Sequence, residues 1–211
     1  MGADGGTIPK RCELVRKKKK QERLDPNFEY AAKYSTCQLS HQPLKKPIVA
    51  CKLGRLYNKT AILEAKLDKS LSANEISKHI KTLNDVKELN LTENKAYKGD
   101  GPDKGDAYKD FNDTPYICPI TALGLNGIHP FLVNWTCGCV FSEKAMQELK
   151  STTCYGCGGE LKTENLITLY PNEELLKVYE KRIVDERAQK LKEQFGSYKE
   201  ILLEKSLTSS F

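Results

Sequence analysis

The sequence CGCVFSEKAMQELKSTTCYGC, which runs from Cys137 to Cys157, carries the clearest structural signal in the chain. It carries two cysteine pairs, Cys137 with Cys139 and Cys154 with Cys157, separated by fourteen residues. Zinc prefers four tetrahedral ligands, and two short turns that each carry two thiolates supply them well. The spacing therefore predicts one structural zinc ion, held by Cys137, Cys139, Cys154 and Cys157. A redox Cys-x-x-Cys pair is the alternative, but it does not explain the Cys-x-Cys pair.

The residues between and around the two pairs favour a small module folded around the metal. The stretch from Ser142 to Leu149 is typical of a short helix, with Ser142 as its N-cap. Glycines at positions 138, 156, 158 and 159 permit the tight turns that direct backbone N–H groups towards the sulfurs. A zinc ion that joins a hairpin to the loop beyond a helix stabilises a module too small to be held by its core alone.

A complete RING module binds two zinc ions, and the ligands of the other site are mostly absent here. Cys118 stands at the first ligand position, but Thr121 follows three residues later, and Ser142 and Ala145 offer neither thiol nor imidazole. We interpret Cys118 as a small buried residue. His129 is the alternative ligand that the sequence leaves open.

An earlier segment of the chain repeats the design of the zinc module. The matching stretches are Cys37–Ser40 with Cys118–Thr121, Pro47–Val49 with Pro130–Leu132, Gly54–Ile62 with Gly138–Met146, and Asp85–Leu89 with Asn165–Leu169. In this copy Arg55 takes the position of Cys139, and no ligand set remains. We expect its loops to be held as in a U-box, by hydrogen bonds, salt bridges and apolar packing, with Cys37 and Cys51 in the core.

These patterns predict an α+β fold with two small RING/U-box-like modules in tandem, followed by a C-terminal helix. The predicted parts are a basic N-terminal arm (1–28), a zinc-free U-box-like module (29–93), a flexible linker rich in Gly, Asp and Lys (94–113), the RING-like zinc module (114–170) and the C-terminal helix (171–211). We expect the two modules to fold independently, so that Cys154→Ser unfolds residues 114–170 alone.

The C-terminal helix carries an apolar stripe. Its residues recur at offsets of four, three and four, and they are Leu191, Phe195, Tyr198 and Leu202. The stripe predicts a packing or partner-docking face, and self-association of the helix stays open.

Basic charge is concentrated near the N-terminus. Residues 1–23 hold eight Lys or Arg against three Asp or Glu, which accounts for most of the formal net charge of +6. The candidate nucleic-acid contacts or nuclear-import signal are Arg16, Lys17, Lys18, Lys19 and Lys20. A solvated basic tail is the alternative interpretation. No apolar run approaches the roughly 20 residues that a membrane span needs, so no membrane partner is expected.

Three stretches resemble the replication termination factor 2 family. They are MGADGGTIPKR at 1–11, PIVACKLGRLYNK at 47–59, and ICP at 117–119 together with CGCVFSE at 137–143. The resemblance runs from Met1 to about Arg187. It implies a nuclear, chromatin-associated protein with a RING-like zinc finger that pauses or terminates replication forks, and whose partners are fork proteins and nascent DNA. In some organisms the family is also linked to pre-mRNA splicing.

The leading hypothesis is a non-enzymatic adaptor at the replication fork, because the sequence has no Gly-rich phosphate loop and no catalytic histidine motif. The competing hypothesis is a ubiquitin or SUMO ligase, which would hold a charged conjugating enzyme in a reactive pose. Leu39 and Ile120, each two residues after a first cysteine, are the candidate partner-docking residues. Gly158 stands where such ligases commonly carry a basic residue, which disfavours ligation. Few Lys or Arg in 114–170 disfavour a sequence-specific DNA binder.

Overall fold

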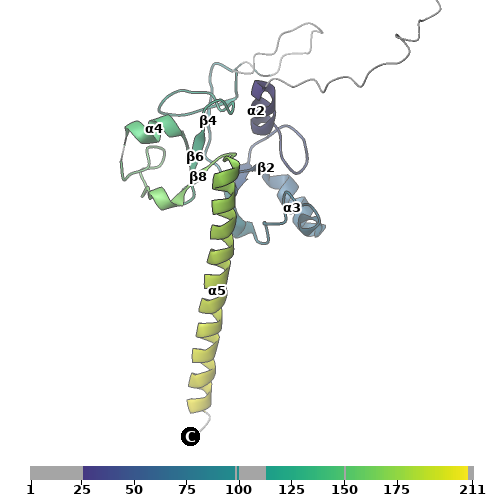
Figure 1. The fold of residues 1–211 in the computed structure, drawn as a ribbon, viewed down its shortest axis with the longest axis vertical. Coiled ribbons are helices and arrows are strands. Elements are labelled where there is room, and N and C mark those ends of the chain that lie inside the picture. Colours follow the sequence, from purple (N-terminus) through teal and green to yellow (C-terminus); the bar gives the residue numbers. More distant parts are fainter. Residues whose placement is uncertain (1–25, 98, 100–112, 150, 209–211) are drawn as a thin grey trace, which may run out of the picture.

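The computed structural model describes residues 26–97, 99, 113–149 and 151–208, with the backbone alone at 26, 27 and 193–208. Helices and small antiparallel sheets make up these residues, which confirms an α+β fold (Figure 1). None of the described helices is long and apolar enough to span a membrane. The predicted nucleic-acid contacts at 16–20 and most of the predicted linker lie outside the described residues.

The first sheet is antiparallel, with strand order β2-β1-β3. Its strands are β1 (Ile48–Cys51), β2 (Leu56–Asn58) and β3 (Val86–Glu88). All four residues of the central strand β1 are buried, as expected for a short continuous apolar run. The predicted helix follows β2 directly as α3 (Lys59–Leu67), and the 3-10 turns η1 (Ser70–Ser72) and η2 (Leu83–Asp85) lead back to β3.

The second sheet repeats this arrangement, with strand order β7-β6-β8. Its elements are β6 (Phe131–Asn134), β7 (Val140–Ser142), α4 (Glu143–Glu148), η3 (Thr163–Asn165) and β8 (Leu166–Thr168). The predicted N-cap is confirmed, because the Ser142 hydroxyl accepts a hydrogen bond from the Ala145 N–H at 3.3 Å. Below, residues 36–93 are the first half and residues 114–170 the second half.

The two halves correspond at the level of single hydrogen bonds. The Lys59 N–H donates to the Pro47 carbonyl at 3.1 Å, and the Glu143 N–H donates to the Pro130 carbonyl at 3.0 Å. A two-stranded sheet joins the halves, because β4 (Thr92–Glu93) pairs with β5 (Tyr116–Ile117). The described ends of the predicted linker are therefore held side by side.

The hydrophobic core is continuous across the two halves. One cluster combines residues of both, among them Ile48, Leu56 and Leu89 from the first half and Phe131 and Leu169 from the second. Such a shared core makes separate folding of the halves unfavourable, because either half alone would expose apolar surface. We therefore replace the expectation of independent modules with one of coupled folding.

Helix α2 (Pro26–Ser35) begins two residues before the predicted end of the N-terminal arm. Its Tyr34 is buried in the shared core, and the Tyr34 hydroxyl donates to the Leu169 carbonyl at 3.1 Å. Helix α2 therefore precedes the first half in the sequence but packs against the second half in the structure.

The predicted C-terminal helix is α5 (Glu173–Thr208), which extends away from the body of the molecule (Figure 1). Its first turns contact both halves. Ile183 is buried in a core cluster of the first half, whereas the Tyr179 hydroxyl hydrogen-bonds Thr168 of the second. Of the predicted stripe, Leu191 is 54% exposed, and Phe195, Tyr198 and Leu202 lie where only the backbone is described. The face that packs is therefore the one that carries Tyr179 and Ile183.

Candidate metal centre

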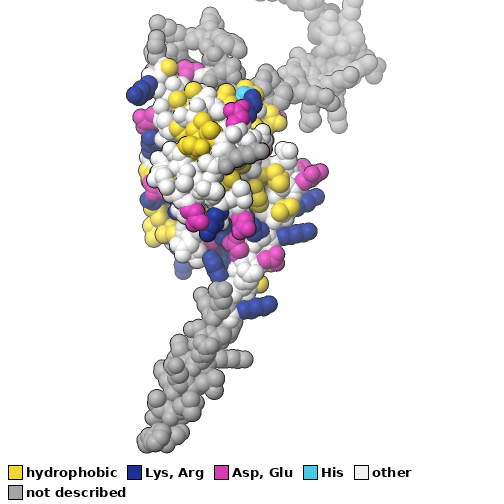
Figure 2. Space-filling model, turned by 90° about the vertical axis from the view of Figure 1, so that its left-hand side faces the viewer, with side chains coloured by type: hydrophobic (Ala, Val, Ile, Leu, Met, Phe, Trp, Pro, Cys, Tyr) yellow, Lys and Arg dark blue, Asp and Glu magenta, His cyan; other side chains and the backbone are white. Residues whose placement is uncertain are grey.

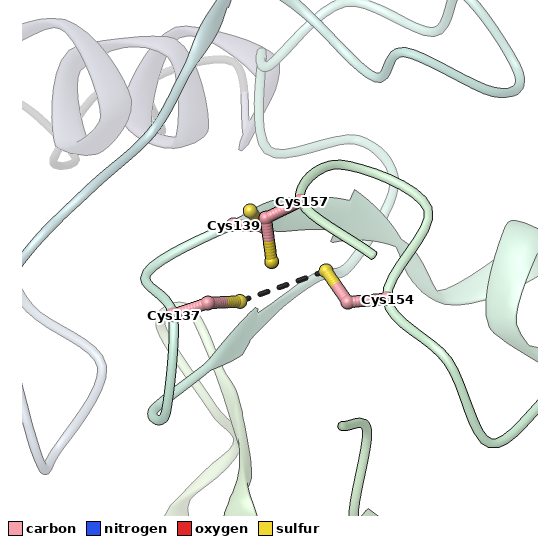
Figure 3. A group of neighbouring side chains, drawn as sticks. All are labelled: Cys137, Cys139, Cys154 and Cys157. Carbon is pink, nitrogen blue, oxygen red and sulfur yellow. Dashed lines mark hydrogen bonds between the residues drawn. The ribbon is translucent and has the colours of Figure 1, made fainter. Parts of the chain in front are cut away.

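The four predicted zinc ligands come together in the second half (Figure 3). Cys137 and Cys139 lie on the turn between β6 and β7, and Cys154 and Cys157 lie on the loop that follows α4. The four sulfur atoms lie within 4.8 Å of one another, and the Cys137 and Cys154 sulfurs are 3.6 Å apart. Sulfurs bound tetrahedrally to zinc at about 2.3 Å would be about 3.8 Å apart. The arrangement therefore fits a zinc ion.

Glycine is required where the two ligand-bearing loops meet. A Cβ atom on Gly156 would lie 2.8 Å from the Cys139 sulfur, so a side chain there would enter the metal centre. In the same loop the Gly158 N–H donates to the Cys154 carbonyl at 2.7 Å, and Gly158 has a φ of +72°. Glycine adopts this left-handed conformation without the steric cost that other residues meet.

The electrostatics of the cluster favour a bound cation. Burial raises the pKa of the Cys154 thiol, but hydrogen bonds from the backbone N–H groups of Cys157 and Gly156 outweigh it and bring the pKa to about 7. Burial raises the pKa of Cys139, and its neighbours Cys137 and Cys154 raise it further. One thiolate forms readily here, whereas several together repel one another unless a cation shares the site.

The donor set indicates a structural site. Four thiols fill every position of a tetrahedron, which leaves no open position for a substrate or water. Among the described residues, this is the one group of three or more potential ligands that could hold a metal ion. Neither Cys118 nor His129 belongs to it.

Hydrogen bonds take the place of the other zinc site of a RING module. Cys118 is 1% exposed, and its sulfur accepts a hydrogen bond from the Ser142 N–H at 3.4 Å. The hydroxyls of Thr121 and Ser142 are 2.9 Å apart and hydrogen-bonded. Burial raises the pKa of Cys118, but its bonds with Thr121 and Ser142 lower it to about 7. The interpretation of Cys118 as a buried residue is confirmed.

The first half contains no counterpart of the metal centre among its described residues. Arg55, at the position of Cys139, donates from Nη1 to the Ile76 carbonyl at 3.1 Å. The Tyr57 hydroxyl donates to the same carbonyl at 3.3 Å. Cys37 and Cys51 are fully buried, as predicted. Hydrogen bonds thus connect the turn of this half to the loop that follows η1 and carries Ile76.

The candidate docking residues Leu39 and Ile120 are half-buried, and each packs against a core cluster. Their side chains therefore have a structural role and leave part of their surface accessible. On the face shown in Figure 2, basic and acidic side chains are interspersed and hydrophobic side chains gather in the upper part of the body. The described residues of this face form no region of a single charge sign.

One feature of the centre was missed from the sequence, namely its contact with the first half. The side chain of Asn90 donates to the Cys137 carbonyl at 3.0 Å, and the Asn90 N–H donates to the Gly138 carbonyl at 2.8 Å. The repeat in the sequence pairs Gly138 with Gly54 and so predicts that the two turns are equivalent. The repeat does not predict that each turn contacts the other half.

Comparison with known proteins places these features in one family. A family model described as Rtf2 RING-finger matches residues 1–203. Proteins named replication termination factor 2 from Gallus gallus and Mus musculus are 47% and 44% identical to the chain over 190 residues. The protein of that name from Bos taurus is 45% identical over 190 residues. These alignments cover 89% of the chain and 62%, 62% and 64% of the relatives, so the chain spans somewhat less than two thirds of their length.

Proposed function

Because the chain belongs to the Rtf2 RING-finger family, we propose that it is a nuclear factor that acts at replication forks in the termination of DNA replication. The cluster of four cysteines is the observation that carries its role as a binding protein. One zinc ion with four protein ligands has no open coordination position, so it stabilises a surface and activates no substrate. The protein acts as an adaptor that binds fork proteins and promotes pausing or site-specific termination.

Two RING/U-box-like modules in tandem form the adaptor, with the bounds predicted from the sequence except that the first module begins with α2, which crosses the predicted boundary after residue 28. The matching strand orders and the matching hydrogen bonds at Lys59 and Glu143 support this organisation. A groove of about 660 Å³ between the halves, next to the metal centre, provides a surface for a protein partner. Its apolar lining includes Pro47, Ile48, Leu89, Leu91, Pro119, Val140, Phe141 and Tyr155.

The basic arm adds attraction to nascent DNA and chromatin. Its run from Arg16 to Lys20 is the strongest concentration of positive charge in the sequence. Contacts between Lys or Arg and phosphates release counterions, so this contribution to binding weakens as salt rises.

Capture of newly replicated DNA tests the proposal. Tagged wild-type protein is expected to be enriched with nascent DNA, and Cys154→Ser is expected to be lost from it. Cys118→Ala is the matched control, because Cys118 is buried outside the metal cluster, and it is expected to behave like the wild type. Absence of the wild-type protein from nascent DNA would contradict the fork proposal and favour the link to splicing.

A ubiquitin or SUMO ligase is the second candidate function. It is favoured by Ile120, which lies two residues after Cys118 and keeps part of its side chain accessible. RING-type ligases act by positioning a conjugating enzyme, and such positioning needs an apolar contact of this kind. A conjugation assay with purified components tests it: transfer by the wild type that Ile120→Ala abolishes would establish the ligase. If neither protein supported transfer, the ligase would be rejected and the adaptor function would stand.

A further inference from the structure

The turn that carries two of the zinc ligands is held by the other half of the molecule. Three hydrogen bonds reach it from the end of β3 and the residues that follow. Asn90 donates from its backbone N–H to Gly138 and from Nδ2 to Cys137, at 2.8 and 3.0 Å, and Lys87 Nζ donates to the Thr136 carbonyl at 2.8 Å. Asn90 and Cys139 also form an isolated β-bridge.

The fit between this turn and the first half is close. Gly138 has a φ of +80°, and a Cβ atom built on it would collide with the carbonyl oxygen of Glu88. The two ligands therefore flank a residue whose backbone lies directly against β3. Because the turn is so short, the carbonyls that Asn90 holds lie within one or two bonds of the Cα atoms from which the sulfurs extend.

The same contact occurs a second time without a metal. Gly54, the equivalent of Gly138, has a φ of +78°, and a Cβ atom on it would collide with the Thr168 carbonyl. The Tyr170 N–H donates to the Gly54 carbonyl at 3.1 Å. Each half thus holds the turn of the other, but only the turn at Gly138 bears metal ligands. Besides the backbone hydrogen bond that each turn receives from the other half, the metal-bearing turn receives a side-chain hydrogen bond, from Asn90 Nδ2 to the Cys137 carbonyl.

We propose that Asn90 is a positioning residue of the zinc site, so that the first half sets part of the zinc affinity of the second. Its side-chain amide fixes the peptide of Cys137 and thereby the direction of the first ligand of the Cys-x-Cys pair. Partners in the outer shell of a metal site hold ligands in their binding orientation, and their loss typically costs about 10- to 100-fold in affinity. Since Asn90 bonds a ligand's carbonyl and not its sulfur, we expect the lower end of that range. The inference rests on the proposal that the four cysteines bind zinc.

Competition for zinc between the full chain and a chromophoric chelator tests this role. Asn90→Ala removes the amide and keeps the backbone N–H, and Asn90 is exposed, so the variant is expected to fold. Its zinc affinity should fall about 10-fold. Asn90→Asp replaces the amide donor with a carboxylate of the same shape, and it should bind zinc at least as weakly. Cobalt(II) bound to each variant reports the ligand geometry in its absorption spectrum, which a loss of global stability alone does not change.

Asn94→Ala is the matched control. Asn94 also donates from Nδ2 to a carbonyl of the second half, that of Thr114 at 3.0 Å, but this bond lies in another part of the contact. Its zinc affinity should stay within about 2-fold of the wild type. Equal affinities for the wild type, Asn90→Ala and Asn90→Asp would overturn the inference, as would an equal loss for Asn90→Ala and Asn94→Ala. A wild-type chain that binds no zinc would instead overturn the zinc site itself.

Discussion

The two halves of the molecule hold equivalent turns in different ways. In the second half, Cys139 belongs to a cluster of four thiols that fits zinc. In the first half, Arg55 stands at the same position and donates to the Ile76 carbonyl, and Tyr57 donates to it as well. Equivalent turns are therefore held by a cysteine cluster that fits a metal ion in one half and by hydrogen bonds in the other. The difference predicts that the halves respond to different perturbations.

The first half needs further stabilising contacts, because hydrogen bonds contribute less free energy than a bound zinc ion. A structural zinc ion contributes on the order of 10 kcal/mol, whereas a hydrogen bond from a charged group contributes about 1.5–3 kcal/mol. The first half has a longer helix after its second strand, nine residues in α3 against six in α4. It also receives α5, whose Ile183 enters its core and whose Arg187 donates to the His79 carbonyl. We infer that α5 supplies much of the stability that zinc supplies elsewhere.

The largest expected effect comes from Cys154→Ser. Loss of zinc removes on the order of 10 kcal/mol, which is comparable with the whole stability of a domain. We expect β6 to lose its protection from hydrogen exchange, and β1 to lose much of its own because the core is shared. Hydrogen exchange followed by mass spectrometry on peptides from both sheets measures this. Unchanged protection of β1 in a protein with an unprotected β6 would restore the idea of independent modules.

Alanine at the two equivalent glycines sharpens the comparison. Gly54→Ala and Gly138→Ala each force a side chain into a left-handed conformation and against a carbonyl of the other half. We expect each to lower the free energy of unfolding by about 2–4 kcal/mol, as measured by urea denaturation. Only Gly138→Ala should also weaken zinc binding. The same loss of zinc affinity in both variants would show that the two turns are not distinct in function.

Arg55→Met tests the hydrogen bonds that replace the metal. The variant keeps most of the apolar stem and removes the donor to Ile76, so we expect a loss of about 2 kcal/mol. Urea denaturation of the zinc-loaded protein measures this, and zinc affinity is expected to be unchanged. Tyr57→Phe, which removes the second donor to the same carbonyl, should cost about 1 kcal/mol. If neither change lowered the free energy of unfolding, the hydrogen bonds to Ile76 would not be what holds the turn of the first half.

The smallest effect concerns acid stability. The pKa of His79 is lowered to about 4, first by burial and then by the charges of Arg55 and Arg187, against an opposing contribution from Asp85. Between pH 6.5 and 4 the unfolded chain binds a proton that the folded chain does not, so stability falls as pH decreases through that window. Since His79 is partly exposed, we expect about 1 kcal/mol. Urea midpoints across this window should vary less for His79→Gln than for the wild type, and equal slopes would contradict the assignment.

Much of this arrangement could be predicted because it depends on local signals. The Cys-x-Cys and Cys-x-x-Cys pairs indicated the cluster, Ser142 indicated the start of α4, and Arg55 in place of Cys139 indicated a half without metal ligands. Each of these residues lies at, or within a few residues of, the structural feature that it predicts. The metal centre was therefore within reach of the sequence.

What could not be predicted depends on contacts between distant parts of the chain. Asn90 is an ordinary polar residue in the sequence, and only the packing of the two halves brings it to Cys137. The packing face of α5 had a weak signal, since Tyr179 and Ile183 are four residues apart, but the more strongly apolar stripe that begins at Leu191 obscured it. Periodicity shows that a face is apolar without showing which surface covers it.

The zinc content of the purified full chain decides whether a metal ion holds the second half of the molecule. Native mass spectrometry should show one zinc ion per wild-type chain, one per Cys118→Ala chain and none per Cys154→Ser chain. This result would establish that the second half holds one zinc ion in the cluster of four cysteines. A wild-type chain with no zinc, or with two ions of which Cys118→Ala loses one, would contradict the account.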